Sequence, residues 1–302
     1  MVAGRRRRWP TLAIGAVAAS VLFAAWRDSA PLADSSERLQ IIPAFLSADE
    51  VRALRSLAAA NHDLFATSEP LHYASVTLPS RWESGASWLT VAIEDRIANV
   101  SGIASNTQDS PLHLAVSRPY DGSLGHAFNM HHDTNKSPRR VATVIIYLSD
   151  EDEDGLLGGE TVFPCLTFNR AANTASTPSD LCARLQDGFT RGHRFLRVAT
   201  ATSGSPAFDG EATAAASELC ARGDSLAARE PSVRIIPRRG TALLFFSGSV
   251  HSHHRHVHAD SWGDMWHGGC RVRQGEKWTL QLFKEMAIGD DGISRQADAT
   301  AM

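Results

Sequence analysis

The sequence has no excess of charge of either sign. Its 302 residues contain 30 Lys and Arg against 33 Asp and Glu, so the formal net charge is −3, and the isoelectric point is near 6.5. Proteins that bind nucleic acid gather positive charge into patches or stripes, so this composition argues against a nucleic-acid partner. A single basic run stands out, at residues 5–8, and no internal repeat is visible.

Long hydrophobic runs are also scarce. The clearest, at residues 9–26, directly follows the basic run, carries no charge, is bounded by tryptophans and is just long enough to cross a bilayer. Because positive charge stays in the cytosol, we expect a cytosolic tail at 1–8, a single-pass type II signal-anchor at 9–26, a stalk at 27–38, and a catalytic part in the lumen of the endoplasmic reticulum or Golgi. A cleaved signal peptide is the alternative, but no small-x-small cleavage site follows the run.

Cysteine is sparse. A lumenal location permits disulfides, and four cysteines allow three pairings. Cys182 and Cys220 bracket a poorly patterned segment, so we expect these two to pair. Buried free thiols are the alternative. The four cysteines are Cys165, Cys182, Cys220 and Cys270.

The remaining chain changes character at about residue 112. Residues 39–111 combine a short strand with helical stretches, one of them with Ser47 as N-cap, and predict helical support for a sheet. Residues 112–286 hold short β-rich runs between turn residues. They predict a mainly β fold with flanking helices and a double-stranded β-helix core of the jelly-roll or cupin kind. We expect an insertion at 166–231, partly ordered at best, and a disordered tail at 287–302.

The stretch HAFNMHHDT contains the first candidate ligands. Alternate residues of a strand face the same way, so His131 and Asp133 are expected to point into the barrel and His132 outward. A third ligand from another strand would complete a face of two histidines and one carboxylate. That arrangement is typical of non-haem iron oxygenases.

Two regions compete to supply the third ligand. His267 is followed by a turn, a cysteine and a β-run that opens with Lys277, which places an imidazole and an ammonium on neighbouring strands of one barrel. The alternative is the histidine cluster at 251–258, a possible separate metal-binding tract. We choose His267 as the ligand and expect the cluster to be a solvated loop near the mouth of the barrel.

Lys277 opens a strand-like run through Phe283. Alternation places Lys277 and Thr279 on one face together with Gln281 and Phe283, and the apolar residues between them on the other face. Lining a barrel with an ammonium group is costly unless an anion meets it. The distal carboxylate of 2-oxoglutarate is such an anion, so Lys277 is predicted to bind this cosubstrate.

Six motifs follow one another in a specific order: HHD, RRVATVIIYLSD, GGETVFP, RRGTALLFF, DMWHGGC and GEKW. Over residues 39–286 the chain resembles the prolyl 4-hydroxylase alpha-subunit family of 2-oxoglutarate- and Fe(II)-dependent dioxygenases, and most of all the small single-chain enzymes of plants and algae. The resemblance implies Fe(2+), 2-oxoglutarate and L-ascorbate as cofactors. It implies a proline-rich or collagen-like peptide as substrate, hydroxylated at proline C4 while 2-oxoglutarate is decarboxylated to succinate.

The resemblance also assigns roles to residues. The iron ligands match His131, Asp133 and His267. Lys277 and Thr161 match the residues that bind the cosubstrate carboxylate, and Thr279, on the face of Lys277, is added to that site. Tyr120 matches a tyrosine with the same role, although it lies about two residues further from His131 than the family pattern expects. Arg140 matches an arginine associated with catalysis and substrate positioning.

Several positions depart from the family pattern, namely Phe128, Phe283 and Arg271, and the insertion at 166–231 is longer than the family norm. These departures touch the substrate side rather than the iron, so the reaction type is better defined than the peptide. A related dioxygenase acting on peptidyl lysine or another side chain is therefore an alternative. A non-catalytic lumenal metal-binding protein is another. The oligomeric state is left open.

Overall fold

The computed structural model covers two facing sheets and the helices around them. The anchor predicted at 9–26 and Tyr120 lie outside the described residues. Among the described helices, none is long and apolar enough to span a bilayer. The described residues are 38–60, 66–68, 73–119, 130–135, 137–166, 180–191, 220, 233–253, 256–261, 263–288 and 294–295.

The larger sheet is antiparallel throughout and seven-stranded. Its strands, in spatial order, are β1 (Leu39–Ile42), β9 (Ala242–Phe246), β5 (Arg140–Tyr147), β14 (Lys277–Glu285), β4 (His113–Ser117), β3 (Tyr73–Thr77) and β2 (Ala66–Ser68). The smaller sheet contains β12 (Gly268–Gly269), β7 (Thr161–Phe163) and β8 (Val233–Ile235), and β6 (Leu157–Gly158) pairs with β13 (Val272–Gln274). The described helices are α1 (Ala48–Ala60), α2 (Trp88–Ser101), α3 (Glu151–Asp154) and α4 (Asp180–Thr190).

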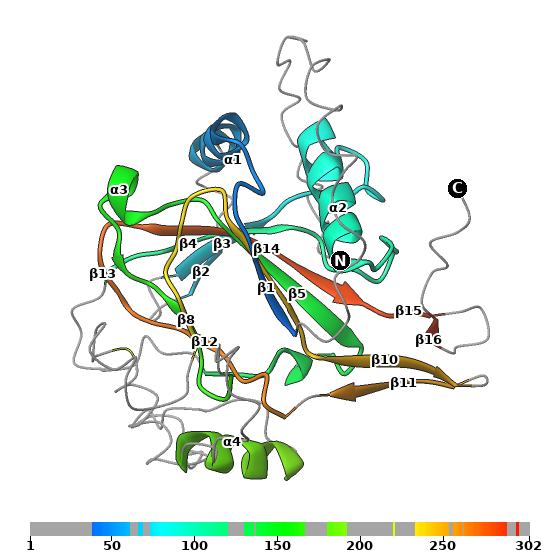
Figure 1. Cartoon of the computed structure of the whole chain (residues 1–302). Helices are drawn as coiled ribbons and strands as arrows, with labels where there is room; N and C mark the ends of the chain where they lie inside the picture. The colour runs from blue at the N-terminus through cyan, green and yellow to red at the C-terminus, as the bar shows by residue number, and fades with distance from the viewer. Residues whose placement is uncertain are drawn as a thin grey trace, which may run out of the picture.

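The elements are stacked in layers. Figure 1 shows α1 and α2 on one side of the larger sheet, the smaller sheet on its other side, and α4 beyond the smaller sheet. Each interface between layers has its own apolar cluster. The first joins α1 and α2 to the larger sheet, the second fills the space between the sheets, and the third joins α4 to the smaller sheet.

Successive side chains of each central strand point to opposite faces of the larger sheet, so each strand contributes residues to two of these interfaces. On β5, Val144 and Ile146 pack beneath the helices, whereas Tyr147 belongs to the cluster between the sheets. On β14, Leu280 and Leu282 likewise pack beneath the helices. Lys277 and Thr279 therefore face the space between the sheets, as alternation predicted.

The predicted fold class is confirmed: two antiparallel sheets face each other and helices flank them, in agreement with a double-stranded β-helix. Ser47 caps α1 as predicted, because its hydroxyl accepts from the Glu50 backbone N–H while its own N–H donates to the Glu50 carboxylate. The segment 39–111 does more than support the sheet, since it also supplies β1, β2 and β3.

The predicted disulfide is wrong. Cys182 on α4 bonds to Cys165, which follows β7, and Cys220 bonds to Cys270, which follows β12. The physical reason is the docking of α4 on the smaller sheet, which brings Cys182 to the end of β7. Both bridges therefore tie the insertion to the smaller sheet.

Two segments expected to lack regular structure form strand pairs. The histidine cluster, predicted as a loop, lies on the hairpin of β10 (Gly248–His253) and β11 (His256–Ser261). The tail predicted as disordered contributes β15 (Ala287–Ile288) and β16 (Ser294–Arg295). In both, antiparallel pairing satisfies backbone groups that a loop would leave to water.

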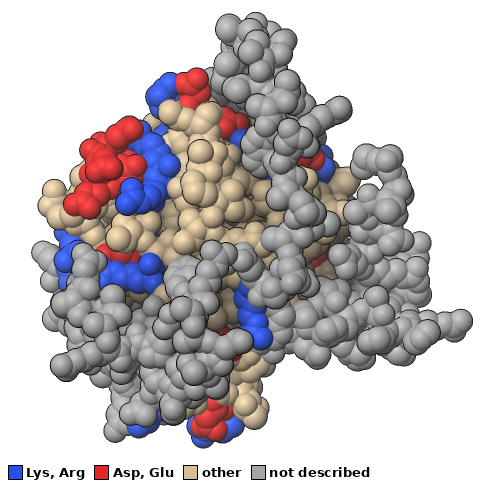
Figure 2. Space-filling view, viewed as in Figure 1, with Lys and Arg blue, Asp and Glu red and all other residues tan. Residues whose placement is uncertain are grey.

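Charges of both signs are mixed on the described surface in Figure 2, where the acidic side chains of α3 lie beside arginines. Asp154 of α3 pairs with Arg55 and Arg239, and Glu153 also pairs with Arg239. These pairs tie α3 to α1 and to the turn before β9.

The ion pair between Lys284 and Asp109 is buried inside the molecule. Lys284, at the end of β14, donates to Asp109 and to the Ala104 carbonyl oxygen, and its side chain is 1% exposed. Burial lowers the pKa of Lys284 and raises that of Asp109, and in each case the opposite charge offsets part of the effect. The pair holds the segment after α2 against the larger sheet.

Replacing Lys284 by Ala is expected to lower the free energy of unfolding by about 3–5 kcal/mol, because it leaves a buried carboxylate without its cation. Urea denaturation at pH 7 measures this. Arg118→Ala is the matched control, since Arg118 pairs with Glu276 at the surface and its loss should cost less than about 1 kcal/mol. Equal losses in the two variants would contradict the role given to Lys284.

Candidate metal centre

Two backbone hydrogen bonds join the segments that carry the predicted ligands. The His131 N–H donates to the His267 carbonyl oxygen at 2.8 Å, and the His267 N–H donates to that of His131 at 2.9 Å. This antiparallel bridge sets the two residues opposite each other. Asp133, two residues on, begins a short 3₁₀ turn.

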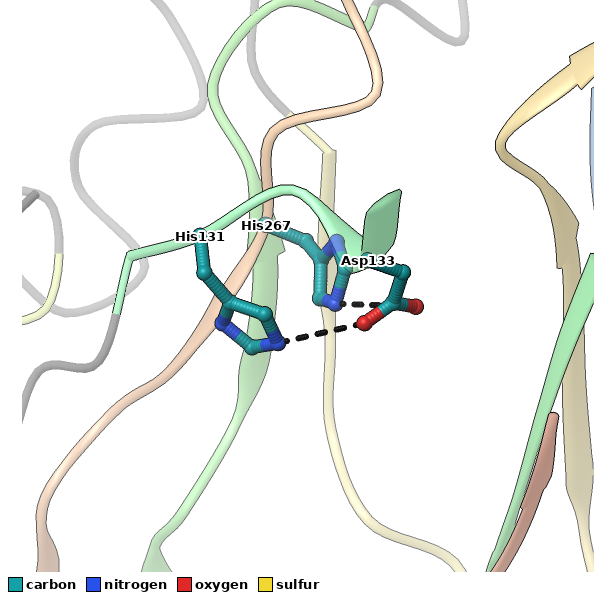
Figure 3. Close-up of side chains that lie close together, drawn as sticks. All are labelled: His131, Asp133 and His267. Carbon is teal, nitrogen blue, oxygen red and sulfur yellow. Dashed lines mark ion pairs between the residues drawn. The ribbon is translucent and has the colours of Figure 1, made fainter. Parts of the chain in front are cut away.

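The three side chains converge, as Figure 3 shows. Their ligand atoms all lie within 4.8 Å of one another. His131 Nε2 is 3.3 Å from Asp133 Oδ1, and His267 Nε2 is 3.6 Å from Asp133 Oδ2. Among the described residues, no other group of histidine, cysteine or carboxylate side chains meets the same criterion.

Two of the converging atoms are buried without a hydrogen-bond partner, Asp133 Oδ1 and His267 Nε2. A buried polar atom without a partner costs free energy, so native proteins rarely leave one. Two such atoms aimed at one point indicate a missing common partner with positive charge. His131 is the most exposed ligand, with 20% of its side chain accessible against 1% for Asp133, so the centre opens on the side of His131.

The ring of His267 is held in the orientation that metal binding needs. Its Nδ1 donates to the Met265 carbonyl oxygen at 3.1 Å, which leaves Nε2 unprotonated and aimed at Asp133. The rings of Phe163 and Phe245 lie 5.4 and 4.6 Å from it, centroid to centroid. Burial lowers the pKa of His267 to about 4 although Asp133 opposes the shift, so the imidazole is neutral at pH 7.

Asp133 is held as a carboxylate. Burial alone would raise its pKa, but the nearby His267 and His131 and the hydroxyl of Thr143 outweigh burial and lower the pKa below its usual range. Thr143, on β5, donates its hydroxyl to Asp133 Oδ2, while Oδ1 faces His131. An ionised carboxylate and a neutral imidazole are the forms that bind a metal ion.

A second group of residues lies around Lys277. Its side chain passes close to two glycines: a Cβ at Gly159 would lie 3.0 Å from Lys277 Cδ, and one at Gly269 would lie 3.8 Å from Lys277 Nζ. Nζ also lies 5.6 Å from the centre of the Tyr147 ring, and the Tyr147 hydroxyl donates to Thr161 Oγ1 at 2.7 Å. The ammonium, the phenol and the threonine thus form one polar cluster between the sheets.

The ammonium of this cluster has no ion-pair partner in the described part of the chain. Glu160 is near enough to raise the pKa of Lys277, but burial prevails and lowers it to about 8. Glu160 is engaged instead by Arg234, which donates to its carboxylate. A buried cation that lacks an anion is a site prepared for an anionic ligand.

The remaining predicted residues are placed as follows. Thr279 faces the space between the sheets from β14, two residues beyond Lys277. Arg140 begins β5 and lies 3.7 Å over the ring of Phe283. It also donates to the carbonyl oxygen of Asp133 at 3.3 Å and to Glu285 at 3.4 Å. His132 faces away from the ligands, as predicted, but it is fully buried beneath α4.

Tyr147 and Thr143 were not predicted as site residues from the sequence. Both lie in the quoted motif RRVATVIIYLSD, four residues apart on β5, where alternation places them on one face. Their signal was polarity at alternate positions of an otherwise apolar strand. This alternation is visible in the motif, from which only Arg140 was predicted as a site residue.

Two imidazoles and one carboxylate that converge on one point, inside a double-stranded β-helix, define the class of mononuclear non-haem iron oxygenases. The chain matches the family model of the 2OG-Fe(II) oxygenase superfamily over residues 115–284. This is more than half of the chain and includes all three ligands and Lys277. The protein belongs to the 2OG-Fe(II) oxygenase superfamily.

Solved structures with a similar fold include prolyl hydroxylases, all at low identity. A viral collagen prolyl hydroxylase from Paramecium Bursaria Chlorella virus-1 is 17% identical, with a TM-score of 0.46, and the match covers 84% of this chain and 93% of that one. A prolyl-4-hydroxylase from Pseudomonas putida is 12% identical, with a TM-score of 0.43 and coverages of 83% and 93%. No curated protein matches the chain in sequence.

We expect the purified protein to bind one ferrous ion per chain and Asp133→Ala to lose this binding, because two neutral imidazoles alone neither complete the coordination face nor balance the charge of the ion. Anaerobic equilibrium dialysis measures the stoichiometry. Two variants should keep one ion per chain: Asp187→Ala, an exposed residue of α4, and a replacement of all five histidines of the cluster at 251–258 by alanine. Loss of the ion in the cluster variant would favour the alternative ligand set.

Proposed function

We propose that this 2OG-Fe(II) oxygenase hydroxylates peptidyl proline at C4 and converts 2-oxoglutarate to succinate in the same turnover. The observation that supports cosubstrate binding most directly is the buried ammonium of Lys277, which lacks an anion and lies beside Thr161 and Tyr147. The prolyl substrate is supported by the ordered motifs that resemble the prolyl 4-hydroxylase alpha-subunit family.

The residues of the centre have separate tasks in this reaction. His131, Asp133 and His267 would hold the ferrous ion. When bound, the ferrous ion would activate O2, the oxidant, with 2-oxoglutarate as co-reductant: one oxygen atom would enter the substrate C–H bond, the other would enter succinate, and carbon dioxide would be released. Thr143 holds Asp133, and Met265 holds the tautomer of His267, so that the protein keeps the ligands in place in a water-poor cavity.

The distal carboxylate of the cosubstrate would meet Lys277, with Thr161 and Tyr147 as hydroxyl partners and Thr279 nearby. Burial raises the pKa of Tyr147, and its hydrogen bond to Thr161 offsets only part of that shift, so the phenol stays neutral and keeps the hydrogen that it donates to Thr161. Tyr120 remains a predicted contact. Arg140, stacked on Phe283 beside the metal ligands, is proposed to position the peptide.

Two further proposals concern the cellular location of the protein and its reductant. The basic and apolar segments at residues 5–26 support a type II membrane protein with a lumenal catalytic part, and the two disulfides fit an oxidising compartment. L-ascorbate is proposed as the reductant that restores the ferrous ion after turnovers without substrate.

A peptide panel tests the prolyl substrate. We would incubate the enzyme with ferrous ion, 2-oxoglutarate and either polyproline, collagen-type or lysine-containing peptides, and measure succinate together with the mass of each residue. One added oxygen on proline supports the proposal. An added oxygen on lysine or another side chain would favour a related dioxygenase, and no succinate with any peptide would favour a non-catalytic metal-binding protein.

Lys277→Ala is expected to weaken 2-oxoglutarate binding roughly a hundredfold or more, since an unpaired buried carboxylate costs about 3–5 kcal/mol. Anaerobic calorimetry of the ferrous protein measures the dissociation constant. Arg273→Ala removes an exposed cation four residues away and should leave the constant unchanged. If Lys277→Ala binds the cosubstrate as wild type does, the residue has been misassigned.

Alkaline pH should weaken cosubstrate binding through the same residue. With a pKa of about 8 in the free protein, Lys277 is charged below that pH and loses its proton above it. The dissociation constant of 2-oxoglutarate should therefore be flat below pH 7 and rise roughly tenfold per unit well above pH 8. Lys277→Arg should abolish this rise because a guanidinium stays protonated. An identical rise in the arginine variant would contradict this origin.

A further inference from the structure

Helix α4 covers the outer face of the segments that carry the metal ligands. On both ligand segments the residues next to the ligands point away from the centre and pack beneath the helix. The apolar cluster of this interface contains Met130, Val162, Leu181, Leu185, Trp266 and Cys270. The ligand-bearing layer therefore lies between the metal centre on its inner side and α4 on its outer side.

His132, the residue between two ligands, is held from two directions. Its ring lies 4.7 Å from the ring of Phe189, near the end of α4. Its Nδ1 accepts from the Thr134 backbone N–H at 3.3 Å and lies 2.7 Å from the Thr134 hydroxyl. His132 thus lies against α4 on the outer face, whereas His131 and Asp133 on either side of it converge on the metal centre.

Phe189 also touches the other ligand segment. A Cβ built on Gly263 would lie 3.2 Å from the Phe189 ring, so the glycine leaves room for that ring. Gly263 lies four residues before His267. One aromatic ring thus contacts both segments that supply ligands.

The position of α4 itself depends on tertiary contacts. An isolated helix of this length is marginal in water. The disulfide between Cys182 and Cys165 holds α4 to the end of β7. Leu185, fully buried, packs in the cluster between Cys182 and Phe189.

We propose that Phe189 is a positioning residue for the metal centre. Through Phe189, α4 holds two segments, the one with His131 and Asp133 and the one with His267, at the separation that a metal ion requires. This inference rests on the proposed function, since it supposes that the three residues bind a metal. Ligand distances must be met within about 0.2 Å, and losing an outer partner of a metal ligand typically costs about 10–100-fold in metal affinity. In this way α4, the described helix of the insertion, serves the centre without supplying a ligand.

The test compares metal affinity with stability. Phe189→Ala should weaken ferrous binding at least about tenfold, measured by anaerobic titration, and should change the visible absorption of the cobalt(II)-loaded protein, which reports coordination geometry. Leu181→Ala is the matched control, because it truncates a buried residue of the same helix and cluster about 12 Å away along the axis. It should lower the thermal midpoint by a similar amount and leave the affinity and spectrum unchanged.

A second pair of variants, at Gly263 and Phe189, keeps the proposal testable if Phe189→Ala fails to fold. Gly263→Ala adds a methyl group against the ring and should weaken metal binding, whereas Phe189→Leu makes room for that methyl. The double variant should then bind no more weakly than Phe189→Leu alone, a non-additivity expected of residues in contact. Strictly additive losses in this cycle would overturn the proposal.

The outcomes separate this inference from the proposed function. If the wild-type protein binds no ferrous ion, the proposed function fails. If it binds one ion and Phe189→Ala binds as tightly with the same cobalt spectrum, only the positioning role is overturned. Equal weakening by Phe189→Ala and Leu181→Ala would also overturn it, because the effect would follow stability alone.

Discussion

The centre depends on one pair of backbone hydrogen bonds, between His131 and His267. This bridge sets two imidazoles from distant parts of the chain opposite each other, and the turn that follows brings in Asp133. The arrangement buries a carboxylate and leaves Asp133 Oδ1 and His267 Nε2 without hydrogen-bond partners. Only a positive ion among them offsets that cost, so the same contacts that define the fold create the demand for a metal.

Both sheets contribute residues to the candidate metal centre and to the polar cluster around Lys277. His267 directly precedes β12 of the smaller sheet, which also supplies Thr161, and the larger sheet supplies Thr143, Tyr147 and Lys277. In the space between the sheets, polar side chains that would be costly to bury singly contact one another or an expected ligand. The apolar clusters on the outer faces hold the two sheets in position. The metal centre remains accessible on the side of His131.

Much of the fold and of the site followed from period-two alternation. It predicted the short strands, the inward direction of the ligand pair and the face of Lys277, because burial on one face of a strand constrains every second residue. It did not predict the disulfides, since four cysteines allow every pairing until α4 is docked. Nor did it reveal the hairpin of the histidine cluster, where polar residues on both faces leave no pattern of burial to read.

The sequence by itself predicted the ligand set and the lysine: two histidines, a carboxylate and Lys277 in an ordered set of motifs, with Lys277 on the inward face of its strand. Only the tertiary structure decided which residues support them. Tyr147 beside Lys277, Thr143 on Asp133 and Phe189 against His132 are contacts between elements distant in the chain. Such contacts depend on how layers pack, and packing depends on the whole set of side chains at once rather than on any local spacing.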